Sequence, residues 1–250
     1  MFMPLPLANK KKYFIPAFLT IAAFYFLWQV NFLGQIAGLS LRAGNYYFNV
    51  YGDGVYDLDK AQKYFNLALK IYPKVPDAWH QLARIDFLRG DYAAALQKIN
   101  KQIEIHGDNF MASYYIRGLI YGYAGRLDEA EKDFLKFLEW DSKNWAAHND
   151  LAWIYFQKGD YDSARTIAQK GLVFAPANPW LLTIYGASLI NLEQKEEARI
   201  ALEQALNEAL KLTEKDWHRA YPGNDPRIAG RGIKEMISAI QFNLGLIVDK

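Results

Sequence analysis

Histidine and carboxylate side chains are the residues of this 250-residue chain whose types suit catalysis or metal binding. Two histidines that share a metal on a helix are commonly four residues apart, because that spacing puts both rings on one face. No two of the four histidines have this spacing; they are His80, His106, His148 and His218. The chain also has no cysteine, which excludes disulfides, thiolate metal ligands and cysteine nucleophiles. We therefore expect no metal site.

The remaining acidic and glycine-rich segments also lack the pattern of a catalytic centre. No phosphate-binding loop of the Walker type is present. The carboxylate pairs Asp128-Glu129 and Glu196-Glu197 stand where predicted helices begin, and there they complement the helix dipole. The sequence predicts a protein that is not an enzyme, with no cofactor and no small-molecule substrate.

The distribution of charge excludes nucleic acid as a partner. The net charge is +2, but residues 1–43 contain four of the basic residues and no acidic one. The other 25 basic residues therefore stand against 27 acidic residues in the rest of the chain. A nucleic-acid-binding domain needs a basic face to neutralise phosphates, and this composition does not supply one.

The N-terminal region has the composition of a membrane anchor. Residues 13–41 form an uncharged run of 29 residues that directly follows Lys10, Lys11 and Lys12. A helix needs about 20 apolar residues to cross the hydrocarbon core of a bilayer. We therefore predict a basic tail over 1–12 and a transmembrane anchor over 13–41 that contacts the lipid bilayer.

The lysines also predict an orientation for this single-pass membrane protein. Only Arg42 follows the apolar run, so the positive-inside rule places the N-terminus in the cytoplasm and the rest on the extracytoplasmic (periplasmic or exterior) side. A cleaved signal peptide is the competing interpretation, with Gly38-Leu39-Ser40 as its passable cleavage site. A buried core helix fits a run of this length and position less well.

Four segments of the chain align with one another at a period of 34 or 35 residues. They are 76–109, 111–144, 145–178 and 179–212. Alanines recur in register at 95, 130, 164 and 198, and glycines recur at 90, 125 and 159. Repeats of this length indicate stacked supersecondary units that bury their apolar faces against their neighbours.

The pattern within these segments resembles the tetratricopeptide repeat, with a bulky residue, a leucine, a small residue and an aromatic in its first helix, and an alanine and an aromatic in its second. The matching residues are Trp79, Leu82 and Ala83 in the first segment, Tyr114, Gly118, Tyr121, Ala130 and Phe134 in the second, Leu151, Ala152, Tyr155, Ala164 and Pro176 in the third, and Tyr185, Gly186, Ala198 and Leu202 in the fourth. The resemblance implies an all-α fold, a right-handed superhelical stack of helical hairpins that follows the N-terminal helix.

Additional segments flank the four repeats. Residues 42–75 keep the register of a second helix but not of a first, and we interpret them as a degenerate capping half-repeat. Residues 213–225 are expected to be a loop. Residues 226–250 are expected to be a C-terminal capping helix, since an apolar stripe recurs on one face at Ile233, Ile237, Ile240, Leu244 and Ile247.

The resemblance also implies where a partner binds, because first helices line the concave face of such a stack. The stripes on these helices that are offset from the packing residues predict an aromatic groove with few charges. Its candidate residues are His80, Arg84, Phe87, Tyr115, Leu119, Asn149, Trp153, Phe156 and Thr183. Such a groove suits a protein or peptide partner held by aromatic anchors. The alternative is that internal packing or the C-terminal helix covers these residues.

These observations together predict a membrane-anchored scaffold or adaptor that binds a protein segment, for a cell-envelope assembly such as a secretion, pilus or wall-synthesis machine. Two alternatives stay open. One is a stoichiometric structural subunit of a membrane complex, and the other is a cytosol-facing import-type receptor.

Overall fold

The computed structural model describes residues 11–50, 54–220 and 225–248, which fold into helices without a β-strand. In chain order the elements are α1 (Lys11–Tyr47), α2 (Leu58–Ile71), α3 (Ala78–Leu88), α4 (Tyr92–His106), the 3-10 turn η1 (Gly107–Phe110), α5 (Ala112–Tyr123), α6 (Leu127–Trp140), α7 (Trp145–Gln157), α8 (Tyr161–Phe174), α9 (Pro179–Asn191), α10 (Lys195–Ala209), α11 (Glu214–Ala220), the 3-10 turn η2 (Pro226–Ile228) and α12 (Ala229–Val248). The predicted all-α fold is confirmed.

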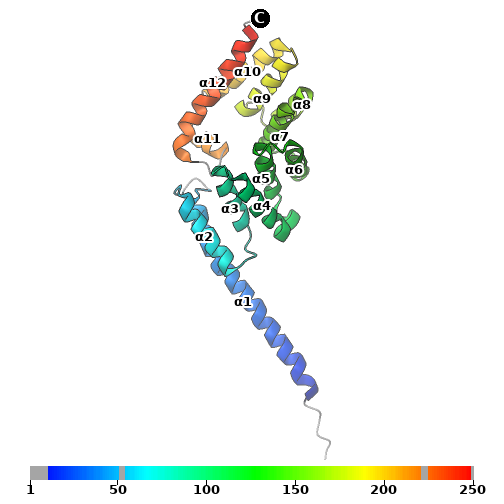
Figure 1. Cartoon of the computed structure of the whole chain (residues 1–250), viewed down its shortest axis with the longest axis vertical. Helices are drawn as coiled ribbons and strands as arrows, with labels where there is room; N and C mark the ends of the chain where they lie inside the picture. Colours follow the sequence, from blue (N-terminus) through cyan, green and yellow to red (C-terminus); the bar gives the residue numbers. More distant parts are fainter. Residues whose placement is uncertain (1–10, 51–53, 221–224, 249–250) are drawn as a thin grey trace, which may run out of the picture.

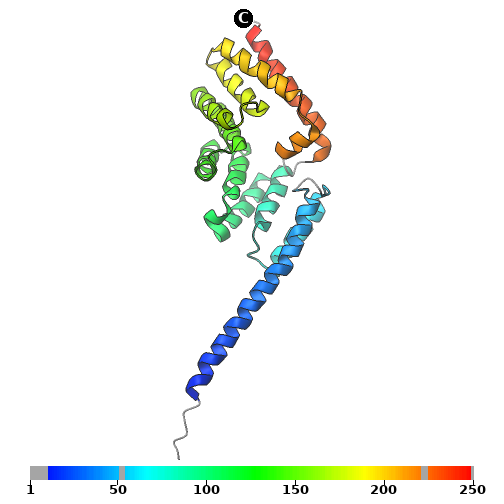
Figure 2. The same cartoon turned by 180° about the vertical axis from the view of Figure 1, so that it is seen from behind.

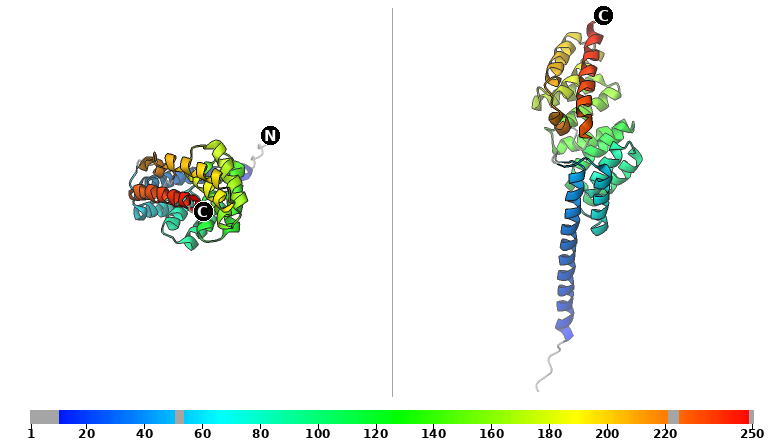
Figure 3. Two further views of the ribbon diagram at one scale, coloured as in Figure 1. Left: turned by 90° about the horizontal axis from the view of Figure 1, so that it is seen from above. Right: turned by 90° about the vertical axis from the view of Figure 1, so that its left-hand side faces the viewer.

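The helices build a curved stack of antiparallel hairpins (Figure 1). The helix α1 is the longest element, and its N-terminal part projects away from the stack, whereas its C-terminal part packs against α2. The pairs α3–α4, α5–α6, α7–α8 and α9–α10 follow in order. Seen from above and from the side, the stack curves so that α12 lies on its inner side (Figure 3).

Two short-range signals recur at the hairpin turns, and the first and third turns have both of them. Gly90, Gly125 and Gly159 end their turns with φ angles of 78°, 75° and 77°, which residues with a Cβ adopt only with strain. Asp91 and Asp160 then cap the second helix of their hairpins, each accepting a hydrogen bond from the backbone N–H three residues later at 3.0 Å. The fourth turn has no glycine, and Glu193 takes the left-handed conformation with φ at 59°.

The two helices of a hairpin approach closely because small residues lie where they cross. The four repeating alanines are fully buried, and they are Ala95, Ala130, Ala164 and Ala198. A Cβ added to Gly118 would lie 3.0 Å from the ring of Phe134, and one added to Gly186 would lie 2.6 Å from Leu202. The backbones of α5 and α9 therefore rest directly on a bulky side chain of the second helix in their hairpins.

The segment before the first full hairpin forms a helix pair of its own. The C-terminal part of α1 crosses α2 at Gly44, where an added Cβ would overlap the ring of Phe65. Phe48 and Phe65 are both fully buried and meet edge to face, with ring centroids 6.3 Å apart. This pair connects to α3 through a continuous apolar core that includes Val75 and Leu82.

The predicted transmembrane anchor over 13–41 is contradicted, and with it the placement of the repeats on the extracytoplasmic side. Within the described residues, no helix combines the length and the apolar character that crossing a bilayer requires. Two features of α1 account for the difference. Exposed polar side chains interrupt the run at Gln29, Asn31 and Gln35, whereas Ala37 at its end is buried in the core against α2. Residues 1–10 of the predicted basic tail lie outside the described residues.

The segment 213–225, which the sequence suggested as a loop, contains the short helix α11. Thr213 and Asp216 cap its start reciprocally, because each side chain accepts a hydrogen bond from the backbone N–H of the other, at 3.0 and 3.3 Å. This arrangement is a capping box, with aspartate in place of the usual glutamate or glutamine. Residues 221–224 of the expected loop lie outside the described part of the chain.

The C-terminal helix α12 packs on the last hairpin. Ile240 is fully buried among Leu182, Leu202 and Ala205, and Ile237, Leu244 and Ile247 of the same stripe pack around this contact. Asp225 caps the turn that leads into the helix, accepting a hydrogen bond from the backbone N–H of Arg227 at 3.0 Å. The end of the chain therefore covers the apolar face that the fourth hairpin leaves open.

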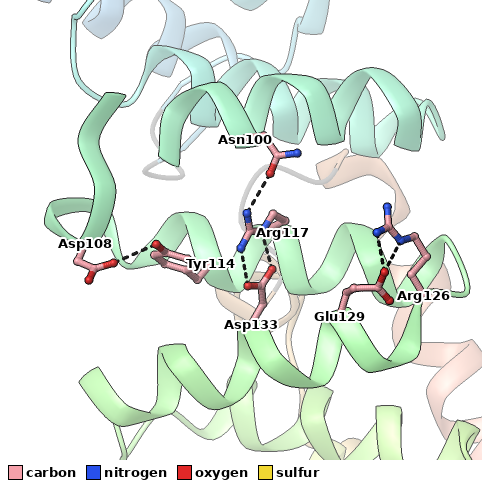
Figure 4. A network of polar contacts seen from close by, with 7 residues as sticks. All are labelled: Asn100, Asp108, Tyr114, Arg117, Arg126, Glu129 and Asp133. Atoms are coloured by element: carbon pink, nitrogen blue, oxygen red, sulfur yellow. Dashed lines mark hydrogen bonds and ion pairs between the residues drawn. The ribbon is translucent and has the colours of Figure 1, made fainter. Parts of the chain in front are cut away.

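A polar network ties α4, α5 and α6 together (Figure 4). Arg117 donates to both carboxylate oxygens of Asp133, at 2.6 and 2.7 Å, and also to Asn100 at 3.0 Å. Because Asp133 is buried, this bidentate pair neutralises a charge that would otherwise be costly to keep out of water. The network fixes the second hairpin relative to the first.

We expect Ala164→Phe to lower the free energy of unfolding by about 1–3 kcal/mol, because the side chain of Ala164 is fully buried at a helix crossing and a ring there overpacks the core. Thr166→Phe, on the exposed side of the same helix α8, is the control and should change stability by less than about 0.5 kcal/mol. Urea unfolding followed by circular dichroism measures both. Equal stabilities of the two variants would contradict the repeat register.

Candidate functional site

The concave side of the stack contains a cavity of about 610 Å³. One wall comes from the first helices α3, α5, α7 and α9, and the facing wall comes from the end of α11 and from α12. Figure 2 shows the second group of helices opposite α5 and α7. The lining is Arg84, Phe87, Leu88, Tyr115, Ile116, Leu119, Tyr123, Trp145, Ala146, Asn149, Asp150, Trp153, Phe156, Gln157, Trp180, Thr183, Ile184, Ala187, Ala220, Met236, Ala239 and Asn243.

Eight of the nine residues that the sequence suggested for the groove line this one cavity. They are Arg84, Phe87, Tyr115, Leu119, Asn149, Trp153, Phe156 and Thr183. The ninth, His80, is absent from the lining. The side chains come together because each lies on the inner face of a first helix, and consecutive first helices stand side by side.

His80 is a packing residue between the first two hairpins. Its ring is buried, and its Nδ1 lies 3.1 Å from the hydroxyl oxygen of Ser113 on α5. Burial, with a smaller contribution from the charge of Arg84, lowers the pKa of His80 to about 3. The imidazole is therefore neutral at physiological pH, and the inner stripe of α3 begins at Arg84 instead.

Aromatic rings dominate the walls of the cavity. Trp153 and Tyr123 have ring centroids 5.5 Å apart, and Tyr123 meets Phe87 edge to face at 5.2 Å. Trp153 is half-buried and packs against Gly122, where an added Cβ would lie 3.0 Å from its ring. The backbone at Gly122 therefore supports the ring of Trp153, and part of the ring surface stays open to the cavity.

Two tryptophans at the start of first helices extend this aromatic wall, and sequence reasoning missed both. Trp145 on α7 and Trp180 on α9 have ring centroids 5.6 Å apart, and Trp217 on α11 follows at 6.2 Å from Trp180. The signal was present in the sequence, since Trp145 and Trp180 are separated by one repeat length. The contribution of α12 was a question that the sequence left open.

The helix α12 forms one wall of the cavity and does not fill it. One of its faces packs on α9 and α10, while Met236, Ala239 and Asn243 face the first helices across the cavity. At its start the chain returns to the N-terminal helix pair, where burial and then the negative charge of Asp225 raise the pKa of Tyr56. The C-terminal region thus spans the concave side from the last hairpin back to the N-terminal helix pair.

Arg84 is the one basic residue in the lining. Its guanidinium donates to Gln81 at 2.9 Å and lies 4.9 Å from the centroid of the Phe48 ring. Burial lowers the pKa of Arg84, and the neighbouring Asp77 carboxylate acts in the opposite direction. The N-terminal helix pair, through Phe48, therefore helps to position this cation at one end of the cavity.

Asp150 is the one acidic residue in the lining, and sequence reasoning missed it although it follows Asn149 directly. Its carboxylate accepts hydrogen bonds from the hydroxyl of Tyr115 at 2.6 Å and from the amide of Asn149 at 3.1 Å. Burial raises the pKa of Asp150 from 3.8 to about 6, because the two uncharged donors offset only part of the desolvation. The cavity therefore contains a carboxylate that is mostly ionised at pH 7.

A second hollow, of about 760 Å³, lies beside α1 and is lined by Asn31, Gly34, Gln35, Gly38, Leu39, Arg42 and Tyr72. It is the more open of the two, and six of its seven lining residues belong to one helix. Because convergent walls from several elements are what define a ligand site, the concave cavity is the better candidate.

Comparison with known sequences finds a tetratricopeptide-repeat match in part of the chain. A family model described as a tetratricopeptide repeat matches residues 115–179. The chain is 26% identical over 136 residues to BBSome complex member BBS4 of Bos taurus, covering 54% of this chain and 26% of that protein. It is 33% identical over 81 residues to tetratricopeptide repeat protein 36 of Homo sapiens, covering 31% of this chain and 43% of that protein. The chain therefore spans less than half the length of these relatives.

Solved structures show the same fold. PilW, a widely conserved type IV pilus biogenesis factor, superposes with a TM-score of 0.63 at 16% identity, covering 86% of this chain and 99% of that chain. YrrB, a tetratricopeptide-repeat protein with an unusual peptide-binding site, superposes with a TM-score of 0.55 at 15% identity, covering 69% of this chain and 86% of that chain. The predicted stack of tetratricopeptide hairpins is confirmed as the fold.

We expect Asp150→Asn to stabilise the protein above pH 6.5 and to leave its stability unchanged near pH 4. The folded chain keeps the proton of Asp150 up to about pH 6, whereas the unfolded chain releases it near 3.8. The free energy of unfolding therefore falls as the pH rises through this window, by at most roughly 3 kcal/mol, and the amide removes that fall. Thermal melts of both proteins from pH 4 to 7.5 measure the difference.

The comparison must be made between the two proteins, because His80 contributes the opposite slope in each. Its pKa is lowered from 6.5 to about 3, so its contribution to stability is lost as the pH falls below 6.5. Asp162→Asn, which removes an exposed carboxylate on α8, is the matched control. A difference between Asp150→Asn and wild type that stays constant from pH 4 to 7.5 would contradict the burial of Asp150 in the cavity.

Proposed function

We propose that this chain is a non-catalytic scaffold that binds a peptide segment of another protein in the concave cavity. The observation that carries the proposal is the aromatic lining, contributed by successive first helices and closed on the other side by α12. Rigid aromatic side chains are the residues that most often anchor a protein partner, because they bury a large apolar area at a small cost in conformational entropy.

The size of the cavity supports a peptide as its occupant. A volume of about 610 Å³ falls within the range of pockets that bury most of a ligand of several residues or of drug size. Tyr115, Asn149 and Thr183 add hydroxyl and amide groups among the rings. Such polar groups can satisfy the backbone of a bound segment and fix its orientation.

The described part of the chain contains no candidate metal cluster. No group of three or more histidine, aspartate or glutamate side chains converges there in a way that could hold a metal ion. The structural likeness to a pilus biogenesis factor makes an assembly machine of the cell envelope one setting in which such a scaffold would act.

A second candidate function is that of a structural subunit that associates through α1. Large apolar side chains are exposed on this helix at intervals of seven residues, at Tyr25, Phe32, Leu39 and Tyr46. A seven-residue interval keeps side chains on one face of a helix and is the spacing at which helices pair along their length. In this case the partner contacts the projecting helix and leaves the cavity empty.

We expect Trp153→Ala to weaken binding of cavity-directed peptides by about 2 kcal/mol or more, as the loss of a central aromatic anchor does. Peptides are first selected from a displayed random dodecamer library on the full chain. Their affinities for wild type and variants are then measured by fluorescence polarisation.

Because Trp153 is half-buried, Trp153→Ala also removes packing from the fold. A second variant therefore separates loss of binding from loss of stability. Ala187→Phe adds a ring to the lining without removing any packing, so it should block the cavity in a fully folded protein. Leu135→Ala, at an exposed position on α6, is the control for both. Selected peptides that bind Ala187→Phe and folded Trp153→Ala as tightly as wild type would overturn the proposal.

A further inference from the structure

The carboxylate of Asp150 has an unusual combination of surroundings. It lies on the inner face of α7, in the lining of the cavity, and both of its hydrogen-bond partners, Tyr115 and Asn149, are uncharged. Within residues 11–50, 54–220 and 225–248, which the structure describes, no lysine, arginine or histidine forms an ion pair with this carboxylate. The negative charge therefore lies at a half-buried position without a cation beside it.

Other buried carboxylates of the stack show how the fold treats such charges elsewhere. Asp133 receives a bidentate guanidinium from Arg117, and Asp86 is paired with the ammonium of Lys98. Both pairs have side chains that are mostly covered. An ionised group that is buried without a partner is the costly arrangement, whereas the same group with a partner is tolerated. Asp150 differs from these two in opening onto a cavity that a ligand can enter.

The rings of Tyr123 and Trp153 line the same cavity as this carboxylate. The charge of Asp150 contributes to the raised pKa of Tyr123, after the larger effect of burial, and so Tyr123 lies within electrostatic range. Tyr123 is exposed at the edge of the cavity and its ring lies 5.5 Å from that of Trp153. The faces of tyrosine and tryptophan rings attract cations electrostatically, and the attraction increases when water is excluded.

Arg84, the basic residue of the lining, already has partners within the protein. The guanidinium of Arg84 is already engaged by Gln81 and by the face of Phe48, and the charge of Asp77 acts on it. A ligand cation at Asp150 therefore gains an ion pair that the protein lacks. A ligand anion at Arg84 would compete with contacts that the protein already makes.

We propose that the cavity selects peptides that carry a lysine or arginine side chain, whose cationic group pairs with the Asp150 carboxylate against the rings of Tyr123 and Trp153. This inference rests on the proposed function and names the chemical class of its ligand. The paired charges act chiefly as a selection against uncharged and acidic side chains, because an ion pair in a partly dry site contributes more to specificity than to affinity.

The test compares displayed peptide libraries selected on three full-length proteins. They are wild type, Asp150→Asn, and Asp162→Asn as the control that removes an exposed carboxylate on α8. Peptides eluted from wild type should be enriched in lysine or arginine at one fixed distance along the peptide from the residue whose binding depends on Trp153. The control should give the same enrichment. Asp150→Asn should abolish it.

One wild-type-selected peptide then serves as a synthetic probe, alongside a copy in which norleucine replaces the basic residue. Wild type should bind the basic peptide at least tenfold more tightly than the norleucine copy, and Asp150→Asn should bind the two equally. Selected peptides could lose binding to Ala187→Phe and yet show no enrichment in lysine or arginine. That result would overturn this inference and leave the proposed function standing. Selected peptides that ignore Ala187→Phe would overturn both.

Discussion

The close approach of two helices at small residues is the constraint on which the rest of the structure depends. Ala95, Ala130, Ala164 and Ala198 are fully buried, and glycines such as Gly118 rest on rings of the facing helix. A hairpin with this geometry exposes an apolar face that only the next hairpin can cover, so the units must stack. Because each unit repeats the same crossing, successive first helices lie on one side and the stack curves around them. The concave cavity is a consequence of this packing.

Most of the fold was predictable because it is specified locally and four times over. The four repeats follow one another at a period of 34 or 35 residues, and their turn glycines and capping aspartates are short-range signals. The structure has one helical hairpin in each repeat. The N-terminal run was misjudged for a physical reason. An apolar run suits a lipid bilayer or a protein core, and Ala37, near the end of this run, is buried by packing against α2 and its neighbours.

The candidate site was predictable on one wall only. The residues of the first helices follow from their periodicity, and eight of the nine converge on the cavity. His80 does not, because it lies one turn before Arg84 on α3, where its ring packs against Ser113 of the next hairpin. The second wall could not be inferred, since the path of α12 back across the concave side is a long-range contact that no local pattern encodes. Asp150 was overlooked because its chemistry depends on that enclosure.

The central claim is that a partner segment occupies the cavity between the first helices and α12. Site-specific photo-crosslinking tests it most directly, with p-benzoylphenylalanine placed at Phe156 in the lining, at Leu135 on an exposed position of α6 and at Phe32 on α1. Position 156 already carries a ring, so the crosslinker leaves room in the cavity. The variants are expressed in cells of the source organism and irradiated, and the adducts are located by mass spectrometry. The account predicts one dominant adduct from position 156 and none from position 135. Adducts from position 32 or 135 with none from position 156 would contradict it.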